Sequence, residues 1–178
     1  ECQGCNWEQE PNEPNGCGGR GESDPYDRQA TRVKRTALGR FAHEGCHHAV
    51  AKDGRVVFYR GDDARMEYVY KFVTAKAWNR NDRAANRDLL DEGTLYVARF
   101  HGDSPAAQID GSGALPADGA FDGWGEWIPL TTDQRSFVDG MSVAEVLLFT
   151  RLAGDAVGAT KMDRPEDVES TLYHASLL

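Results

Sequence analysis

The sequence predicts an all-β protein with short helices. From Thr31 onward, short apolar or alternating segments are separated by turn residues, which is typical of strands of ordinary length. These segments are residues 33–41, 48–51, 55–60, 67–73, 94–100 and 125–130. Irregular connections between clusters of strands fit propeller blades of about 40–45 residues better than a regular sandwich. The pattern therefore favours the blades of a β-propeller.

The clearest local signal is a β-hairpin around Asp53-Gly54. Two β-branched segments, residues 49–51 and 55–58, flank this dipeptide. Asp-Gly supplies the positive φ angles of a two-residue type I′ turn, so we expect the two segments to pair. Further along, residues 82–90 are expected to form a short helix or helical turn, and residues 101–124 a long loop.

A second helix is expected near the C-terminal end. Ser142 and Glu145 have the spacing of a capping box and precede the apolar residues 146–149. Gly154 is a suitable residue to end such a helix. Because a short apolar segment also suits a buried strand, the sequence leaves both structures open.

Composition and charge limit the possible partners. The chain has 178 residues, of which 40% are hydrophobic, and a net charge of −9, which suits one globular domain. A surplus of acidic residues disfavours nucleic acid and anionic membranes, and suits bound cations. No apolar segment approaches the roughly 18 residues that span a bilayer, and the first residues lack the pattern of a signal peptide.

The chain divides into two regions. Residues 1–30 are rich in Pro, Gly, Asn and acidic residues and predict a poorly ordered polar arm, whereas residues 31–178 predict the β domain. Cys2 and Cys5 form a Cys-x-x-Cys pair without a second pair or His pair at zinc-finger spacing. We therefore expect the cysteines in the first seventeen residues, Cys2, Cys5 and Cys17, to be incidental or disulfide-forming rather than metal ligands, while the role of Cys46 stays open.

Four segments, in order, resemble one known family. They are residues 33–41 running into His43-Glu44-Gly45, residues 61–65 running into 67–72, residues 90–100, and residues 158–166 with the motif Met-Asp-Arg-Pro-Glu. Together they cover roughly residues 31–168, which is more specific than any single short motif. In this pattern the chain resembles the PhoX family of secreted alkaline phosphatases.

The resemblance implies a function and a fold. It implies part of a monomeric six-bladed propeller that hydrolyses phosphate monoesters in the periplasm or outside the cell, with calcium and iron at its centre. A cysteine segment that ligates iron in the family does not precede His43-Glu44-Gly45 here, and the C-terminal blades with further ligands would follow Leu178. We therefore expect an inactive fragment, and one that self-associates through uncovered strand edges and apolar faces.

The resemblance also assigns roles to particular residues. Glu44 and Glu166 correspond to carboxylates of the metal centre, and Arg164 corresponds to an arginine that faces the phosphate. Asp62 and Asp63 lie in a family motif and are further candidate metal ligands. These residue types suit the chemistry, because calcium prefers carboxylate oxygens and arginine donates two parallel hydrogen bonds to phosphate.

Each of these residues also has a structural interpretation. Glu44 is typical of an exposed carboxylate at the end of a strand, and Asp62-Asp63 of a turn. Residues 163–166 are a good helix start, with Asp163 as N-cap. A second function, a non-enzymatic calcium-binding or interaction propeller module, therefore stays open. A propeller lactonase or esterase ranks last, since the sequence has no Gly-x-Ser-x-Gly motif.

Overall fold

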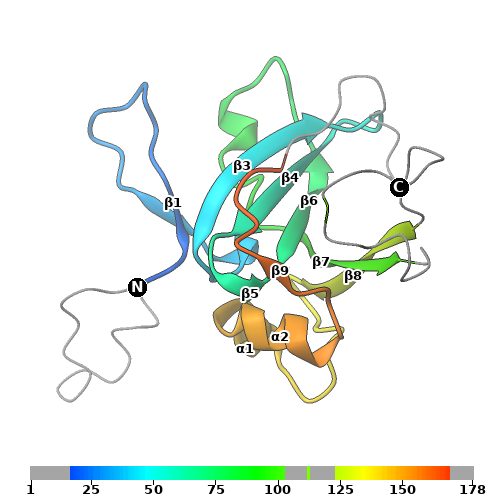
Figure 1. Cartoon of the computed structure of the whole chain (residues 1–178). Coiled ribbons are helices and arrows are strands. Elements are labelled where there is room, and N and C mark those ends of the chain that lie inside the picture. Colours follow the sequence, from blue (N-terminus) through cyan, green and yellow to red (C-terminus); the bar gives the residue numbers. More distant parts are fainter. Residues whose placement is uncertain (1–16, 103–111, 113–122, 169–178) are drawn as a thin grey trace, which may run out of the picture.

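The structure is a computed structural model that describes residues 17–102, 112 and 123–168. Its centre is an antiparallel sheet of five strands in the order β3-β4-β6-β7-β8. The strands are β3 (His43–Val50), β4 (Arg55–Asp62), β6 (Val69–Ala77), β7 (Gly93–Gly102) and β8 (Gly123–Thr132). Neighbours in the sheet follow one another along the chain, so the sheet is a meander (Figure 1).

Two small sheets flank this meander. β1 (Arg20–Glu22) pairs with β2 (Val33–Arg35), and β5 (Arg65–Glu67) pairs with β9 (Met162–Asp163). The helices are short: η2 (Thr36–Leu38) and η3 (Ala84–Asn86) are 3₁₀ turns, and α1 (Val143–Leu148) and α2 (Thr150–Ala156) are α-helices. The expectation of a mainly β protein with short helices is confirmed.

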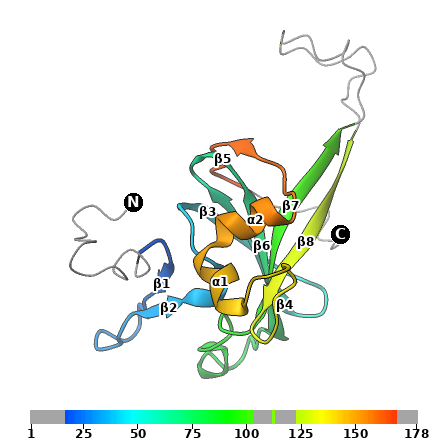
Figure 2. The same ribbon diagram turned by 90° about the horizontal axis from the view of Figure 1, so that it is seen from below.

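The main core lies between one face of the sheet and helices α1 and α2, which cover that face in Figure 2. Tyr68, Tyr70 and Phe72 point to this side because alternate residues of a strand share a face. Helix α2 approaches very closely at Gly154, where a Cβ would lie 2.8 Å from a ring carbon of Tyr68. Gly154 therefore lies inside α2, where it permits close contact between helix and sheet. The prediction that Gly154 ends a helix is wrong.

The opposite face of the sheet carries a smaller cluster. Val57 and Val73 are buried there, with Tyr59 and Tyr96 packed against them. Phe100, which shares the alternation of the aromatic residues along β7, is 50% exposed and contributes little to either core. None of the helices in the described part of the chain has the length and apolar character needed to cross a bilayer.

The β3–β4 hairpin is confirmed, but the predicted turn type is wrong. The pairs His48↔Phe58 and Val50↔Val56 define the hairpin. A type I′ turn requires positive φ at both central residues, and Asp53 does not have it, whereas Gly54 has φ 83°. The Gly54 N–H donates to the Ala51 carbonyl at 2.9 Å, so the loop is one turn followed by a left-handed glycine.

The predicted strand over residues 33–41 is too long. Extended chain ends at Arg35, and the 3₁₀ turn η2 follows, with Gly39 at φ 79° after it. Arg35 is 2% exposed and forms ion pairs with Glu22 and Asp91, which fix the end of β2. The bend then turns Leu38 into the main core.

The helix after Ser142 forms as the capping box predicts. The Ser142 hydroxyl accepts from the Glu145 N–H at 3.3 Å, and the Glu145 carboxylate accepts from the Ser142 N–H at 2.8 Å. A strand in this position is therefore ruled out. Residues 82–90 contain η3, as expected, while most of the predicted loop 101–124 lies outside the described residues.

Candidate functional site

The segment after β9 crosses one face of the sheet over β3 and β4 (orange to red in Figure 1). Its main chain touches the sheet at two glycines. A Cβ on Gly61 would lie 1.9 Å from the Pro165 carbonyl oxygen, and a Cβ on Gly45 would lie 3.1 Å from the Glu166 carbonyl oxygen. Any larger side chain at Gly61 would collide with backbone, so this crossing requires glycine there.

The crossing brings the family-like motifs together. Gly45 follows Glu44 in β3, and Gly61 precedes Asp62 in β4, so the chain around residues 164–167 lies beside both motifs. Glu44 and Glu166 are both exposed. The main chain of Glu166 is therefore a close neighbour of the residue next to Glu44, although the two lie far apart in the sequence.

Arg164 has an unusual backbone and two acidic partners. It has φ 53°, which is uncommon for a residue with a side chain. Its Nε and Nη2 donate to the two carboxylate oxygens of Asp63 at 2.8 and 3.0 Å, and Nη2 also lies 2.8 Å from the Glu166 carboxylate. The hydrogen bond and charge of Asp63 raise the pKa of Arg164, so this guanidinium stays charged.

This geometry leaves one side of the Arg164 guanidinium open. The Arg164 side chain is 53% exposed, and Nη1 donates no hydrogen bond to any acceptor within the described part of the chain. The Asp63 carboxylate accepts two hydrogen bonds on the Nε–Nη2 side and thereby fixes the plane of the guanidinium. The Nη1 side is therefore held in a defined orientation and can bind an external oxyanion.

The helix start predicted for residues 163–166 is wrong. Asp163 ends strand β9, and the chain from Arg164 to 168 has no helical structure. The pairing of β5 with β9, through Arg65↔Asp163 and Glu67↔Met162, holds Asp163 in extended conformation instead. A tertiary contact thus overrides the local preference for a helix.

Asp62 and Asp63 are adjacent but have different environments. Asp62 has no exposed surface, and both of its oxygens accept from Arg151, at 2.8 and 2.7 Å, while one also accepts from the Ala42 N–H at 3.2 Å. The hydrogen bonding of Arg151 to Asp62, which accepts, is the main reason that the pKa of Arg151 is raised. Asp62 thus joins helix α2 to the end of β4, and only Asp63 of the pair reaches Arg164.

The candidate metal ligands are of the type that a hard cation prefers, but they are too few to complete its coordination shell. Glu44, Glu166 and Asp63 offer carboxylate oxygens, whereas calcium takes six to eight oxygen ligands. Across residues 17–102, 112 and 123–168, no group of three or more His, Cys, Asp or Glu side chains is arranged to hold a metal ion. The described residues therefore do not form a complete calcium or iron site by themselves.

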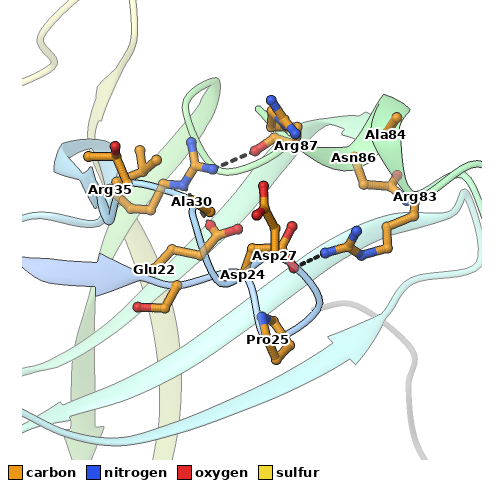
Figure 3. Close-up of a pocket in the computed structure, with 13 residues that line it drawn as sticks. Glu22, Asp24, Pro25, Asp27, Ala30, Arg35, Arg83, Ala84, Asn86 and Arg87 are labelled. Carbon is orange, nitrogen blue, oxygen red and sulfur yellow. Dashed lines mark hydrogen bonds and ion pairs between the residues drawn. The ribbon is translucent and has the colours of Figure 1, made fainter.

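A polar cavity of about 530 Å³ lies elsewhere, between the β1–β2 region and the turn η3 (Figure 3). Arg83 pairs with Asp24, and Arg35 donates to the Arg87 carbonyl and pairs with Glu22. Acidic and basic side chains alternate on its wall, and the carboxylates among them oppose binding of a phosphate group. This cavity is not the place where the predicted site residues meet.

The sequence did not reveal several residues that build the crossing. Gly45 and Gly61 were visible only as parts of motifs, and their role depends on the backbone that lies over them. Arg151 carries no local signal at all, because its partner Asp62 lies on another element.

Of the cysteines, Cys17 is disulfide-bonded, as one of the expected alternatives has it, and Cys46 is free and exposed; Cys2 and Cys5 lie outside the described residues.

Comparisons with known proteins agree with the motifs. The family model described as alkaline phosphatase PhoX matches residues 4–176. Among solved structures, one described as Pseudomonas fluorescens PhoX in complex with vanadate, a transition state analogue, is 46% identical with a TM-score of 0.72. The match covers 88% of this chain but only 26% of that protein. No curated protein matches the chain.

Proposed function

Because this chain belongs to the alkaline phosphatase PhoX family, we propose that it forms part of an enzyme that hydrolyses phosphate monoesters. The observation that carries the proposal is the crossing over Gly45 and Gly61, which brings Arg164 and Glu166 beside the motifs that contain Glu44 and Asp63. The chain covers only 26% of the length of the similar solved protein. We therefore propose that this chain contributes some, but not all, of the residues of the phosphatase active site.

Arg164 is proposed to face the phosphoryl group. Its charge is fixed, and a planar guanidinium donates to phosphate oxygens on which negative charge increases in the transition state. Asp63 acts as the positioning residue, since it holds the Nε–Nη2 side and leaves Nη1 for the substrate. Vanadate in the similar solved structure is described as a transition state analogue, which supports an oxyanion site of this kind.

Glu44 and Glu166 are the proposed metal ligands, with Asp62 and Asp63 as the weaker candidates. Calcium and iron held there would supply positive charge for the phosphoryl group. Because these carboxylates are too few for a full coordination shell, the remaining ligands must come from other parts of the enzyme.

In the same way, we propose that the five-stranded sheet is one part of a six-bladed propeller, and that residues 1–30 are an arm of the β domain 31–178.

Secretion to the periplasm or the cell exterior is proposed from the family, and the disulfide at Cys17 supports it, because disulfides persist in oxidising compartments. The chain alone is expected to self-associate, although the family protein is proposed to be monomeric. The exposed side chains of Phe100, Trp124 and Leu152 support this expectation. Sizing chromatography tests it, and a sharp monomer peak with cooperative melting contradicts it.

Hydrolysis of p-nitrophenyl phosphate, with calcium and iron supplied, tests the enzymatic proposal. We expect turnover from the complete gene product, its loss on Arg164→Met, and little or none from the 178-residue chain. Full activity from this chain alone contradicts the idea of a shared site. No turnover from a correctly folded, metal-loaded gene product contradicts the phosphatase itself.

The alternative is a non-enzymatic module that binds calcium or another protein. It is favoured by the surplus of acidic residues, which gives the chain a net charge of −9, and its candidate ligands are Asp62 and Asp63. Calorimetry with calcium distinguishes the two proposals in the complete gene product. Binding that is lost on Glu44→Gln and on Glu166→Gln supports a metal centre at the crossing, whereas binding that survives both leaves only surface carboxylates.

A further inference from the structure

Arg60 is a buried arginine in the middle of strand β4. It has no exposed surface, and it lies on the face of the sheet that carries the main core. Its Nη1 donates to the Leu38 carbonyl at 2.6 Å, and its guanidinium lies 5.1 Å from the centre of the Phe41 ring. These contacts fix the plane of the guanidinium but satisfy only part of it.

The other side of the same guanidinium has no partner in the part of the chain that the structure describes. Nε and Nη2 of Arg60 are buried, and neither has a hydrogen-bond acceptor among the residues that the structure describes. A buried polar group normally finds a partner, and a buried charge without one is strongly destabilising. Two adjacent orphaned donors on one side of a planar group therefore indicate a missing acceptor with two oxygens.

Two other arginines of this chain show what such a side binds. Arg151 grips both oxygens of Asp62 through Nε and Nη2, and Arg164 grips both oxygens of Asp63 in the same way. We propose that the Nε–Nη2 side of Arg60 is a binding site for a carboxylate, which completes the same double hydrogen bond. This site is distinct from the proposed phosphate contact, and it does not depend on the phosphatase proposal.

The surroundings of Arg60 favour an anion, and among residues 17–102, 112 and 123–168 no carboxylate is within hydrogen-bond distance of its Nε or Nη2. Asp62, two residues further along β4, is already held by Arg151. His43 lies 3.4 Å from Nη1, and Cys46 is the residue directly opposite Arg60 on β3. Arg20, which donates to the Glu44 carbonyl, adds a second positive charge nearby.

Two sources can provide the carboxylate. Cys46, the residue opposite Arg60, is free and exposed, so the first source is a small free carboxylate that reaches Arg60 from the Cys46 side. Alternatively, an Asp or Glu side chain from another part of the longer enzyme fills the position. Both satisfy the same two donors, and they differ only in whether the ligand exchanges with solution.

NMR of the arginine side chains distinguishes these sources. In the 178-residue chain, titration with acetate against sodium chloride of equal ionic strength should move the Arg60 Nε–H signal in a saturable way if free carboxylate enters. The Nε–H signals of Arg151 and Arg164 are internal controls, because their carboxylates are already bound. Saturating acetate should also raise the melting temperature by about 5–10 °C at a hundredfold excess over the dissociation constant, and Arg60→Met should abolish this increase.

If acetate has no effect, the complete gene product decides the question. If a protein carboxylate binds Arg60, the Arg60 Nε–H signal of the complete gene product should resemble those of Arg151 and Arg164. Arg60→Met should then lower the melting temperature of the complete gene product more than that of the 178-residue chain. The proposal is overturned if neither protein shows a carboxylate-bound Arg60. It is also overturned if Cys46→Ala, without acetate, shifts the Arg60 Nε–H signal away from those of Arg151 and Arg164, because the Cys46 sulfur would then be the partner.

Discussion

The carbonyl oxygen of Pro165 lies over Gly61 so closely that a Cβ there would be 1.9 Å away. This contact joins two family-like motifs that are far apart in the sequence. It also fixes the height at which residues 164–167 pass over β3 and β4, and thereby the position of Arg164 relative to Asp63. The geometry of the proposed site therefore depends on a glycine without any reactive group.

Gly61→Ala should displace the crossing segment and separate Arg164 from Asp63. We expect a loss of about 1–3 kcal/mol in the free energy of unfolding, because the obstacle is backbone that cannot rotate away. In the complete gene product, phosphatase activity should fall by more than this change in stability explains. Urea denaturation and the rate of p-nitrophenyl phosphate hydrolysis measure the two effects.

Gly21→Ala is the matched control, since a Cβ on Gly21 meets nothing within 4 Å. It should leave both quantities unchanged. If Gly61→Ala is as harmless as Gly21→Ala, the crossing does not exist in solution as described.

Asp63→Asn should weaken catalysis without weakening the fold. The substitution removes the charge that orients Arg164, whose side chain is 53% exposed, so stability should change by less than about 0.5 kcal/mol. We expect kcat/KM of the complete gene product to fall about fivefold, equivalent to about 1 kcal/mol. Asp53→Asn, which disturbs a similar exposed pair with Arg55, should have no effect on kcat/KM.

Arg151→Met should destabilise the chain strongly. It leaves the carboxylate of Asp62 fully buried with only the Ala42 N–H as a partner, and an uncompensated buried charge costs about 3 kcal/mol or more. Equilibrium unfolding in urea measures the change. Arg55→Met, which breaks an exposed pair, should cost less than about 1 kcal/mol, and equal losses in the two variants would contradict the structural role of Asp62.

Lys71→Met should change how stability depends on pH. Burial lowers the pKa of Lys71 to about 8 from the ordinary 10.5, although its amine lies 4.6 Å and 4.9 Å from the centres of the Trp127 and Tyr96 rings, which favour the charged form. Between these two pKa values the unfolded chain holds a proton that the folded chain has released. The stability contribution of Lys71 therefore rises with pH in this window, by at most about 1.4 kcal/mol per pH unit.

Below about pH 8 the buried ammonium is a constant penalty, so Lys71→Met should stabilise the protein at pH 7. This advantage should shrink between about pH 8 and 10.5. Thermal unfolding across that range, with the exposed Lys76→Met as control, provides the measurement. An advantage that is independent of pH would show that Lys71 does not titrate there.

Local signals in the sequence predicted local structure well. The capping box at Ser142 and the hairpin around Gly54 depend on contacts within a few residues, so the sequence contains all the information that they need. The family motifs around Glu44, Asp62 and Arg164 were recognisable for the same reason, as short patterns in a fixed order. Even so, the turn type at Asp53 and the length of the strand from Val33 were wrong, because tertiary contacts decide where such segments bend.

Alternating strands and ordered motifs are properties of the linear order of residues, so they were sufficient to predict a mainly β chain of the alkaline phosphatase PhoX family. Only the tertiary structure decided which partner each charge has. Asp62 and Asp63 are neighbours in the chain, yet one is buried against Arg151 and the other meets Arg164. Charges and close backbone contacts act through space, so the crossing at Gly61 and the open side of Arg60 exist only once the sheet has formed.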